Sequence, residues 1–222
     1  MPHSQSNPVL VSDFDGTMTR HDFYQLARAR WWNEAEPDPW QDYLAGRLTH
    51  FDALNRFFAR IRSDEAGLRA FLDGMELDPT LPAALERLHR AGWRIVIASA
   101  GCEWYIRHLL ARIRTPFVLH ANPGRLTPEG GLQMVPPVTS PFFSRATGID
   151  KTAVMRDALA SSERVAFAGD GPPDLPPARL VPGQRRFARG YLADALRKEG
   201  EAFHPLSRWE KLAATLLEDW HT

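Results

Sequence analysis

The sequence contains a single cysteine, Cys102, among its 222 residues. One thiol excludes an internal disulfide framework and a cysteine-rich zinc site, and it favours a reducing, cytoplasmic compartment. Long hydrophobic runs are also absent, because no apolar stretch approaches the ~18 residues that a membrane span needs. The polar start, Met-Pro-His-Ser-Gln-Ser-Asn, lacks the basic and apolar regions of a signal peptide. We therefore expect a cytoplasmic protein with no membrane partner.

Neither sign of charge is in excess. Lys+Arg and Asp+Glu both total 27, so the formal net charge is zero. A balanced chain gives no electrostatic support for binding to nucleic acid or to an anionic membrane surface. A small soluble molecule is the partner expected on these grounds, and the oligomeric state, monomer or homodimer, stays open.

A short apolar run near the start of the chain ends in two carboxylates. Val9-Leu10-Val11 predicts a buried parallel strand, with Asp13 at its carboxyl end and Asp15 just beyond, where the chain turns at Gly16. Two carboxylates this close repel each other unless a cation or a shared proton compensates. A magnesium site with one carboxylate free to attack phosphorus explains the pair. The alternative is a plain strand end followed by an aspartate-capped turn.

The rest of the chain predicts an α/β fold, a Rossmann-like parallel sheet flanked by helices. Strand-like apolar runs recur and alternate with helical patterns, as parallel sheets with right-handed crossovers require. We expect further strands at residues 93–98, 117–119 and 164–168, an edge strand at 186–188, and a hairpin from 125 to 134. Asp150 is expected to cap the helix that begins with Lys151.

Residues 21–75 differ from this pattern. Strand-like runs disappear, and apolar and aromatic residues such as Phe51, Leu54, Phe57 and Phe58 recur at helical spacing. We expect a small all-helical cap domain at residues 21–75 with a core of its own. Residues 1–20 and 76–222 would form the α/β core domain.

Polar residues follow several of the predicted strands. Ser99 follows the second strand, Lys151 opens a helix, and Asp170 and Asp174 follow the strand at 164–168. The carboxyl ends of parallel strands meet at one edge of a sheet, so these groups are expected to lie near Asp13. Acids, a hydroxyl and a cation together suit phosphoryl transfer, in which positioning and charge neutralisation dominate.

DFDGT, the Ser99 strand end, Lys151 and GDGPPD, in this order, resemble the four motifs of the haloacid dehalogenase-like superfamily. The helical insert resembles the type-1 cap of that family. The resemblance implies that Asp13 is a nucleophile forming an aspartyl-phosphate, and that Asp15 is its general acid and base. Because members that act as dehalogenases have no acid at this second position, Asp15 favours ester hydrolysis.

The resemblance also implies the remaining roles. Ser99, with the backbone N–H groups near Ala100 and Gly101, would bind the phosphoryl oxygens, and Lys151 would neutralise nucleophile and phosphate together. Asp170 would complete a Mg²⁺ site with Asp13 and the Asp15 backbone carbonyl. Asp174 would support the metal site or orient Lys151, although it is also a candidate helix N-cap.

The motifs and the small cap look most like the phosphoserine phosphatase branch. Phe187-Ala188-Arg189-Gly190-Tyr191-Leu192 and His204-Pro205-Leu206 are similar to a methionine-salvage phosphatase of that branch. Two features depart from these patterns. Residues 139–145 contain no cysteine where the salvage enzymes are cysteine-rich, and Pro173 stands where phosphoserine phosphatases carry Asn.

Two insert residues are candidates for substrate specificity. Asp22 stands where phosphoserine phosphatases place an acid facing the substrate amine, and Arg56 follows Phe51 at the spacing of their carboxylate-binding arginine. Inward orientation of both would indicate a polar, zwitterionic or hydroxylated substrate. The alternatives are an N-cap for Asp22 and a solvated helix face for Arg56.

The expected function is a Mg²⁺-dependent phosphomonoesterase acting on a small phosphorylated metabolite, of phosphoserine-like or methionine-salvage type. Two other functions stay open. One is a phosphotransferase on the same scaffold, and the other is a catalytically silent binding or regulatory protein, which only Pro172 and Pro173 support.

Overall fold

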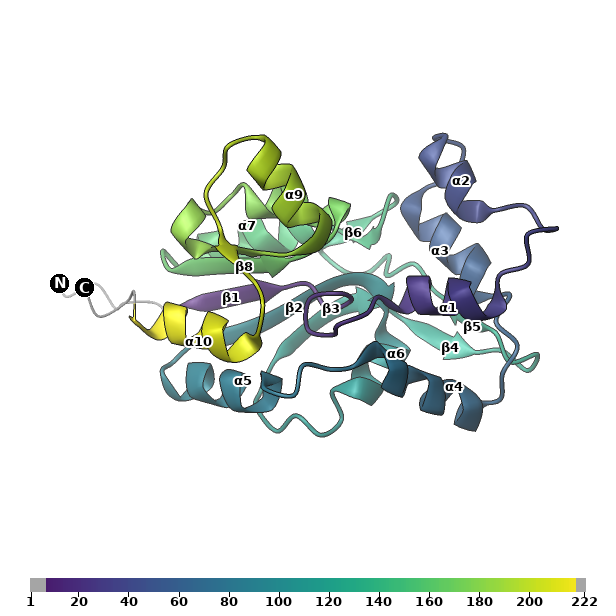
Figure 1. Cartoon of the computed structure of the whole chain (residues 1–222), viewed down its shortest axis with the longest axis horizontal. Coiled ribbons are helices and arrows are strands. Elements are labelled where there is room, and N and C mark those ends of the chain that lie inside the picture. Colours follow the sequence, from purple (N-terminus) through teal and green to yellow (C-terminus); the bar gives the residue numbers. More distant parts are fainter. Residues whose placement is uncertain (1–6, 219–222) are drawn as a thin grey trace.

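A six-stranded parallel sheet runs through the molecule in the order β10-β9-β8-β1-β2-β3 (Figure 1). The computed structural model describes residues 7–218. The strands of this sheet are β1 (Val9–Ser12), β2 (Arg94–Cys102), β3 (Val118–Asn122), β8 (Val165–Gly169), β9 (Arg186–Ala188) and β10 (His204–Pro205). The predicted Rossmann-like α/β class is confirmed.

Strand β1 lies between β2 and β8, and alternate side chains along these strands enter two different cores. Leu10 and Ile97 face the core below the sheet in Figure 1, which helices α5 (Leu81–Arg90), α6 (Glu103–Leu109) and α10 (Trp209–Glu218) cover. Val11 and Val96 face the core above it, which helices α7 (Lys151–Ser161), α8 (Leu175–Ala178) and α9 (Gly190–Lys198) cover. Apolar burial on both faces explains why the strands are continuous hydrophobic runs.

The segment between β1 and α5 is helical, as expected. It contains α1 (Phe23–Trp31), α2 (Pro39–Leu44), α3 (His50–Phe58), α4 (Glu65–Leu72) and the short 3-10 helix η1 (Asp73–Met75). Aspartate or threonine side chains cap the N-termini of all four α-helices by accepting backbone N–H bonds. The division into a cap at residues 21–75 and a core domain stays a prediction.

One detail of the prediction for this insert is wrong. Its aromatic residues do not form a core of their own, because Phe23, Phe57 and Phe58 belong to the same apolar cluster as Leu10 and Ile97 of the sheet. Phe23 stacks on Tyr105 of α6 at 4.4 Å between ring centroids, which joins the insert to the α/β layer. The side of the insert that packs on the sheet is therefore part of the main core.

The remaining short elements refine the sequence prediction. The predicted hairpin is formed by β4 (Gly124–Leu126) and β5 (Leu132–Met134), and it packs against α3. The loop after it contains a second small pair, β6 (Phe143–Ser144) and β7 (Gly148–Ile149). Two further 3-10 helices, η2 (Pro172–Asp174) and η3 (Gly183–Arg185), lie between β8 and β9. Within residues 7–218 no helix is long and apolar enough to cross a bilayer.

Two strand boundaries differ from those predicted. Strand β9 is not at the edge, because β10 pairs outside it. Strand β2 continues past the expected end at Ala98 through Ser99 to Cys102, with a register shift against β3 over this stretch. The shift is a local irregularity of the kind found near active sites, and it places Ser99 at the sheet edge although the residue lies within a strand.

Candidate active site

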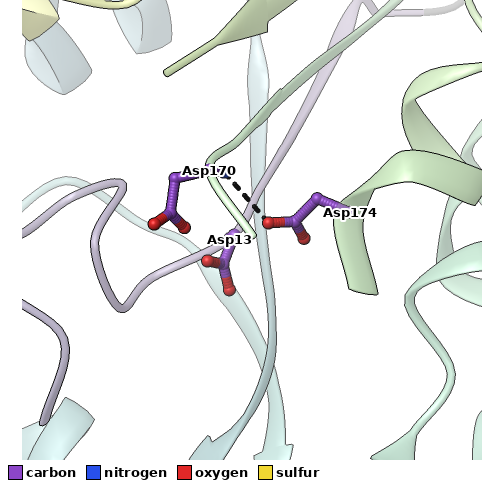
Figure 2. A group of neighbouring side chains, drawn as sticks. All are labelled: Asp13, Asp170 and Asp174. Carbon is purple, nitrogen blue, oxygen red and sulfur yellow. Dashed lines mark hydrogen bonds between the residues drawn. The ribbon is translucent and has the colours of Figure 1, made fainter. Parts of the chain in front are cut away.

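Three aspartates meet at the carboxyl edge of the sheet. Asp13 directly follows β1, Asp170 follows β8, and Asp174 ends η2. One carboxylate oxygen from each lies within 4.8 Å of the others, and Figure 2 shows the three side chains converging. We call Asp13, Asp170 and Asp174 the acidic cluster. Their convergence is the one expected from parallel strands that end at a common edge.

Lys151 neutralises part of this charge. Its Nζ donates to Asp13 Oδ1 at 2.6 Å and to Asp174 Oδ1 at 2.7 Å. The lysine side chain is only 6% exposed, and the two carboxylates raise the pKa of Lys151 against the opposing effect of burial. The ammonium is therefore fixed and charged beside the carboxylate that was predicted to attack.

Asp174 is fully buried and has no free oxygen. Its Oδ1 accepts from Lys151, and its Oδ2 accepts from the backbone N–H groups of Asp170 at 3.0 Å and Gly171 at 2.9 Å (Figure 2 draws the bond from Asp170). The side chain makes no capping bond to helix α8. Of the uses considered from the sequence, the contacts favour orientation of Lys151 over capping of helix α8.

Asp170 carries the least compensated charge of the cluster. Burial, followed by the negative charges of Asp13 and Asp174, raises the pKa of Asp170 to about 9. Its Oδ1 lies 3.1 Å from the Thr17 hydroxyl, which is also 3.3 Å from Asp13 Oδ2. A site that holds a carboxylate against this penalty is suited to a cation with oxygen ligands.

Asp15 is held by groups from two other elements. Its Oδ2 accepts a 2.7 Å hydrogen bond from the Tyr105 hydroxyl, and its Oδ1 accepts from the Phe23 N–H at 3.2 Å. Burial, then the charges of Asp22 and Asp13, raises the pKa of Asp15 well above its usual value. A carboxyl that retains its proton in this way is suited to general acid catalysis.

Tyr105 was not among the predicted site residues. It lies on α6, in the first turn after the polar stretch that ends β2. Its signal in the sequence was its place in the first turn after that stretch, where a side chain returns toward the strand ends. The hydroxyl is the polar part of an otherwise buried ring, and Asp15 is its partner.

Arg189 is a second residue that the sequence reasoning did not assign to the site. Its guanidinium donates to the backbone carbonyls of Gly16 and Thr19, and thereby closes the turn after β1. Gly16 has φ +70°, and a Cβ there would lie 2.2 Å from Asp170 Oδ2, so the turn requires glycine. The acidic cluster can thus approach the turn closely.

The predicted phosphate-binding residues also reach the site. Ser99 is buried, accepts from the Gly101 N–H at 2.9 Å and lies 3.4 Å from Asp15 Oδ2. Asn122 donates to the Ala100 carbonyl at 2.7 Å and the Thr147 carbonyl at 3.0 Å, which links this turn to the segment before Lys151. Ala100 and Gly101 line the same cavity as Asp13.

A cavity of about 1060 Å³ lies between the sheet edge and the helical insert. Only one of the two specificity candidates lines it. Asp22 lines it and also caps α1 by accepting from the Gln25 N–H. Burial is the main reason that the pKa of Asp22 rises to about 6. Arg56 is exposed and does not line the cavity, because α3 buries Phe57 and Phe58 instead. Of the two orientations weighed for Arg56, the structure shows the solvated helix face and not the inward one.

Comparison with known proteins identifies the class. The model of the haloacid dehalogenase-like hydrolases matches residues 10–179, and the chain belongs to this family, as the order of the motifs predicted. A curated relative, the 2-hydroxy-3-keto-5-methylthiopentenyl-1-phosphate phosphatase of Bacillus pumilus, is 21% identical over 199 residues, which are 87% of this chain and 84% of the relative.

Solved structures agree on the fold. A HAD family hydrolase from Salmonella enterica serovar Typhi superposes with a TM-score of 0.72 at 20% identity, covering 97% of this chain and 72% of that chain. A substrate-bound phosphoserine phosphatase superposes with a TM-score of 0.64 at 11% identity, covering 97% and 99% of the two chains. The predicted likeness to this branch of the family is confirmed.

Proposed function

We propose that the protein is a Mg²⁺-dependent phosphomonoesterase that works through an aspartyl-phosphate on Asp13. The observation that carries the proposal is the buried bridge from Lys151 to Asp13 and Asp174, with Asp170 beside it. A cation, a nucleophilic carboxylate and a second set of acid ligands are the parts that phosphoryl transfer requires. The phosphatase relatives and the family membership support the same reaction.

In the first half-reaction an Asp13 carboxylate oxygen bonds to phosphorus and the bond from phosphorus to the ester oxygen breaks. The departing alkoxide takes a proton from Asp15, whose raised pKa favours the protonated form needed at this step. Tyr105 and the Phe23 N–H hold Asp15 in place. Lys151 remains charged and offsets the negative charge shared by Asp13 and the phosphoryl group.

In the second half-reaction Asp15 acts as a base. It removes a proton from a water molecule whose oxygen bonds to phosphorus, and the bond from phosphorus to Asp13 breaks to release inorganic phosphate. The phosphoryl oxygens are held by Ser99 and by the backbone N–H groups of Ala100 and Gly101. The Gly101 N–H bonds to Ser99 Oγ in this structure, so it exchanges that partner when phosphate binds.

The donor set fits Mg²⁺. Asp13 and Asp170 each offer a carboxylate oxygen, and burial together with the negative charges of Asp13 and Asp174 raises the pKa of Asp170, a penalty that a bound cation would offset. The Asp15 backbone carbonyl would complete the set, and Asp174 would contribute by holding Lys151 and the loop after β8. When bound, Mg²⁺ neutralises phosphoryl charge and aligns the phosphate with Asp13.

The substrate is proposed to be a small phosphorylated metabolite, of phosphoserine-like or methionine-salvage type. Residues 21–75 would act as a cap domain that selects it. The single cysteine supports a reducing, cytoplasmic location. A phosphotransferase would use the same first half-reaction, and the appearance of phosphate on an added alcohol would identify it.

The test is phosphate release from a panel of phosphate esters by the full chain. We expect that EDTA abolishes turnover and that Mg²⁺ restores it. Asp170→Asn should reduce the rate of turnover and raise the Mg²⁺ concentration required for the half-maximal rate. Asp194→Asn, which alters an exposed aspartate on α9, is the control and should behave as wild type. Turnover that is indifferent to EDTA would contradict the proposal.

A further inference from the structure

Aromatic rings from the helical insert line part of the cavity. Tyr24 of α1, Trp40 and Tyr43 of α2, and His50 of α3 all line it, and we call these four residues the aromatic wall. These helices stand at the insert end of the molecule in Figure 1. Because the rings come from the insert and the acids from the sheet edge, the cavity between them suits a ligand with two unlike ends.

The four rings form one continuous group. Tyr24 stacks on Trp40 at 4.6 Å, Trp40 lies 5.0 Å from Tyr43, and His50 meets Trp40 and Tyr43 edge-on at 5.6 Å and 5.4 Å between centroids. Burial lowers the pKa of His50 to about 4, so its ring is neutral at neutral pH. The wall is therefore uncharged, and besides its rings it holds two buried polar atoms without a hydrogen-bond partner, the Tyr24 hydroxyl and His50 Nδ1.

The positive side chains around the cavity are already engaged. Arg20 pairs with Glu76 at 3.0 Å, Arg28 pairs with Asp38 at 3.2 Å, and Arg189 donates to backbone carbonyls of the turn after β1. Arg56, the arginine expected to bind a substrate carboxylate, lies outside the cavity. Each arginine that lines the cavity in the described part of the chain thus already has a partner within the protein. We infer that none of them is reserved for a carboxylate on the substrate.

We infer that the substrate is a phosphate monoester of an alcohol with a flat, uncharged ring, which packs on the aromatic wall while its phosphate lies at Asp13 and Lys151. This inference rests on the proposed phosphatase function, and it replaces the phosphoserine-like and methionine-salvage candidates with an ester of a ring-bearing alcohol. The cavity of about 1060 Å³ has room for a ring-bearing ligand in addition to the phosphate. Aromatic rings attract other rings through both area burial and their edge-to-face or stacked geometry.

The test compares primary alkyl phosphates of similar leaving-group chemistry, with Mg²⁺ present. We expect kcat/KM for 2-phenylethyl phosphate to exceed that for ethyl phosphate at least tenfold, and to exceed those for phosphoserine and phosphocholine. Trp40→Ala should lower the ratio of the 2-phenylethyl to the ethyl value at least fivefold. Tyr43→Leu is a second wall variant, used if the first does not fold by circular dichroism.

Trp31→Ala is the matched control. Trp31 packs on Phe71 at 4.5 Å and does not line the cavity, so this variant should keep the wild-type ratio. Equal kcat/KM for the two alkyl esters, a preference for phosphoserine or phosphocholine, or an equal loss in Trp31→Ala would overturn the ring inference and leave the phosphatase proposal standing. No Mg²⁺-dependent release from any ester, 4-nitrophenyl phosphate included, would overturn the proposed function itself.

Discussion

The acidic cluster and the aromatic wall bound the same cavity and are built in opposite ways. The cluster stands on two strand ends and on η2, and its carboxylates, of which Asp13 and Asp174 are buried, bond to Lys151, to backbone N–H groups or to the Thr17 hydroxyl. The wall stands on short helices, is partly exposed, and touches mainly other rings. Chemistry that must be placed to a fraction of an ångström is carried by the rigid sheet, and recognition by the insert.

The largest expected effect is on the cluster. Asp13→Asn removes the proposed nucleophile, and we expect kcat to fall by at least ~10³-fold because a neutral amide is a far weaker nucleophile than a carboxylate. The amide keeps the shape of the side chain, so the circular dichroism spectrum should match that of wild type. Efficient release of phosphate by this variant would show that Asp13 is not the attacking group.

Lys151→Met should impair both activity and stability. The variant leaves Asp13 and Asp174 buried without their cation, and loss of one partner of a buried ion pair costs about 3–5 kcal/mol. We expect a lower denaturation midpoint and a fall in kcat/KM of roughly 10²-fold or more. Lys198→Met, at an exposed position in α9, is the control, and comparable destabilisation of both variants would contradict the ion-pair argument.

His50 of the aromatic wall should affect how the free energy of unfolding depends on pH. The pKa of His50 is about 4 in the folded protein and near 6.5 in the unfolded chain. At pH values between these two, His50 binds a proton in the unfolded chain but not in the folded protein. The contribution of neutral His50 to the stability of the folded state is therefore complete above pH 6.5 and is lost as the pH falls toward 4. Urea unfolding from pH 7.5 to 4.5 should show a shallower decline in His50→Phe than in wild type. Parallel curves would rule out the buried neutral histidine.

The smallest effects distinguish the two specificity candidates. Asp22→Asn keeps a side chain that can cap α1 but removes a charge from the cavity, so we expect a several-fold change in KM with little change in stability. Arg56→Ala should leave kcat/KM within twofold of wild type, because the side chain is exposed on α3. A larger effect of Arg56→Ala than of Asp22→Asn would reverse the assignment.

These differences explain what the sequence could predict. Asp13, Ser99 and Asp170 stand at or beside strand ends, and the parallel topology alone brings such positions together. Whether Arg56 or Trp40 faces the cavity depends on how short helices pack on the sheet, which helical periodicity does not specify. Tyr105 escaped prediction because a buried tyrosine has the same pattern as a core aromatic, and Arg189 because its partners are backbone carbonyls.

The hydrogen bonds that close the turn after β1 have a consequence for folding. The carbonyls of Gly16 and Thr19 are held by Arg189, and that of Thr17 accepts a 3.0 Å bond from Trp209 Nε1. These partners lie 170 to 192 positions further along the sequence. Contacts of such long sequence separation form late and slow folding. We therefore expect the loop that carries Asp13 and Asp15 to reach its final form among the last steps of folding, together with the cavity that it lines.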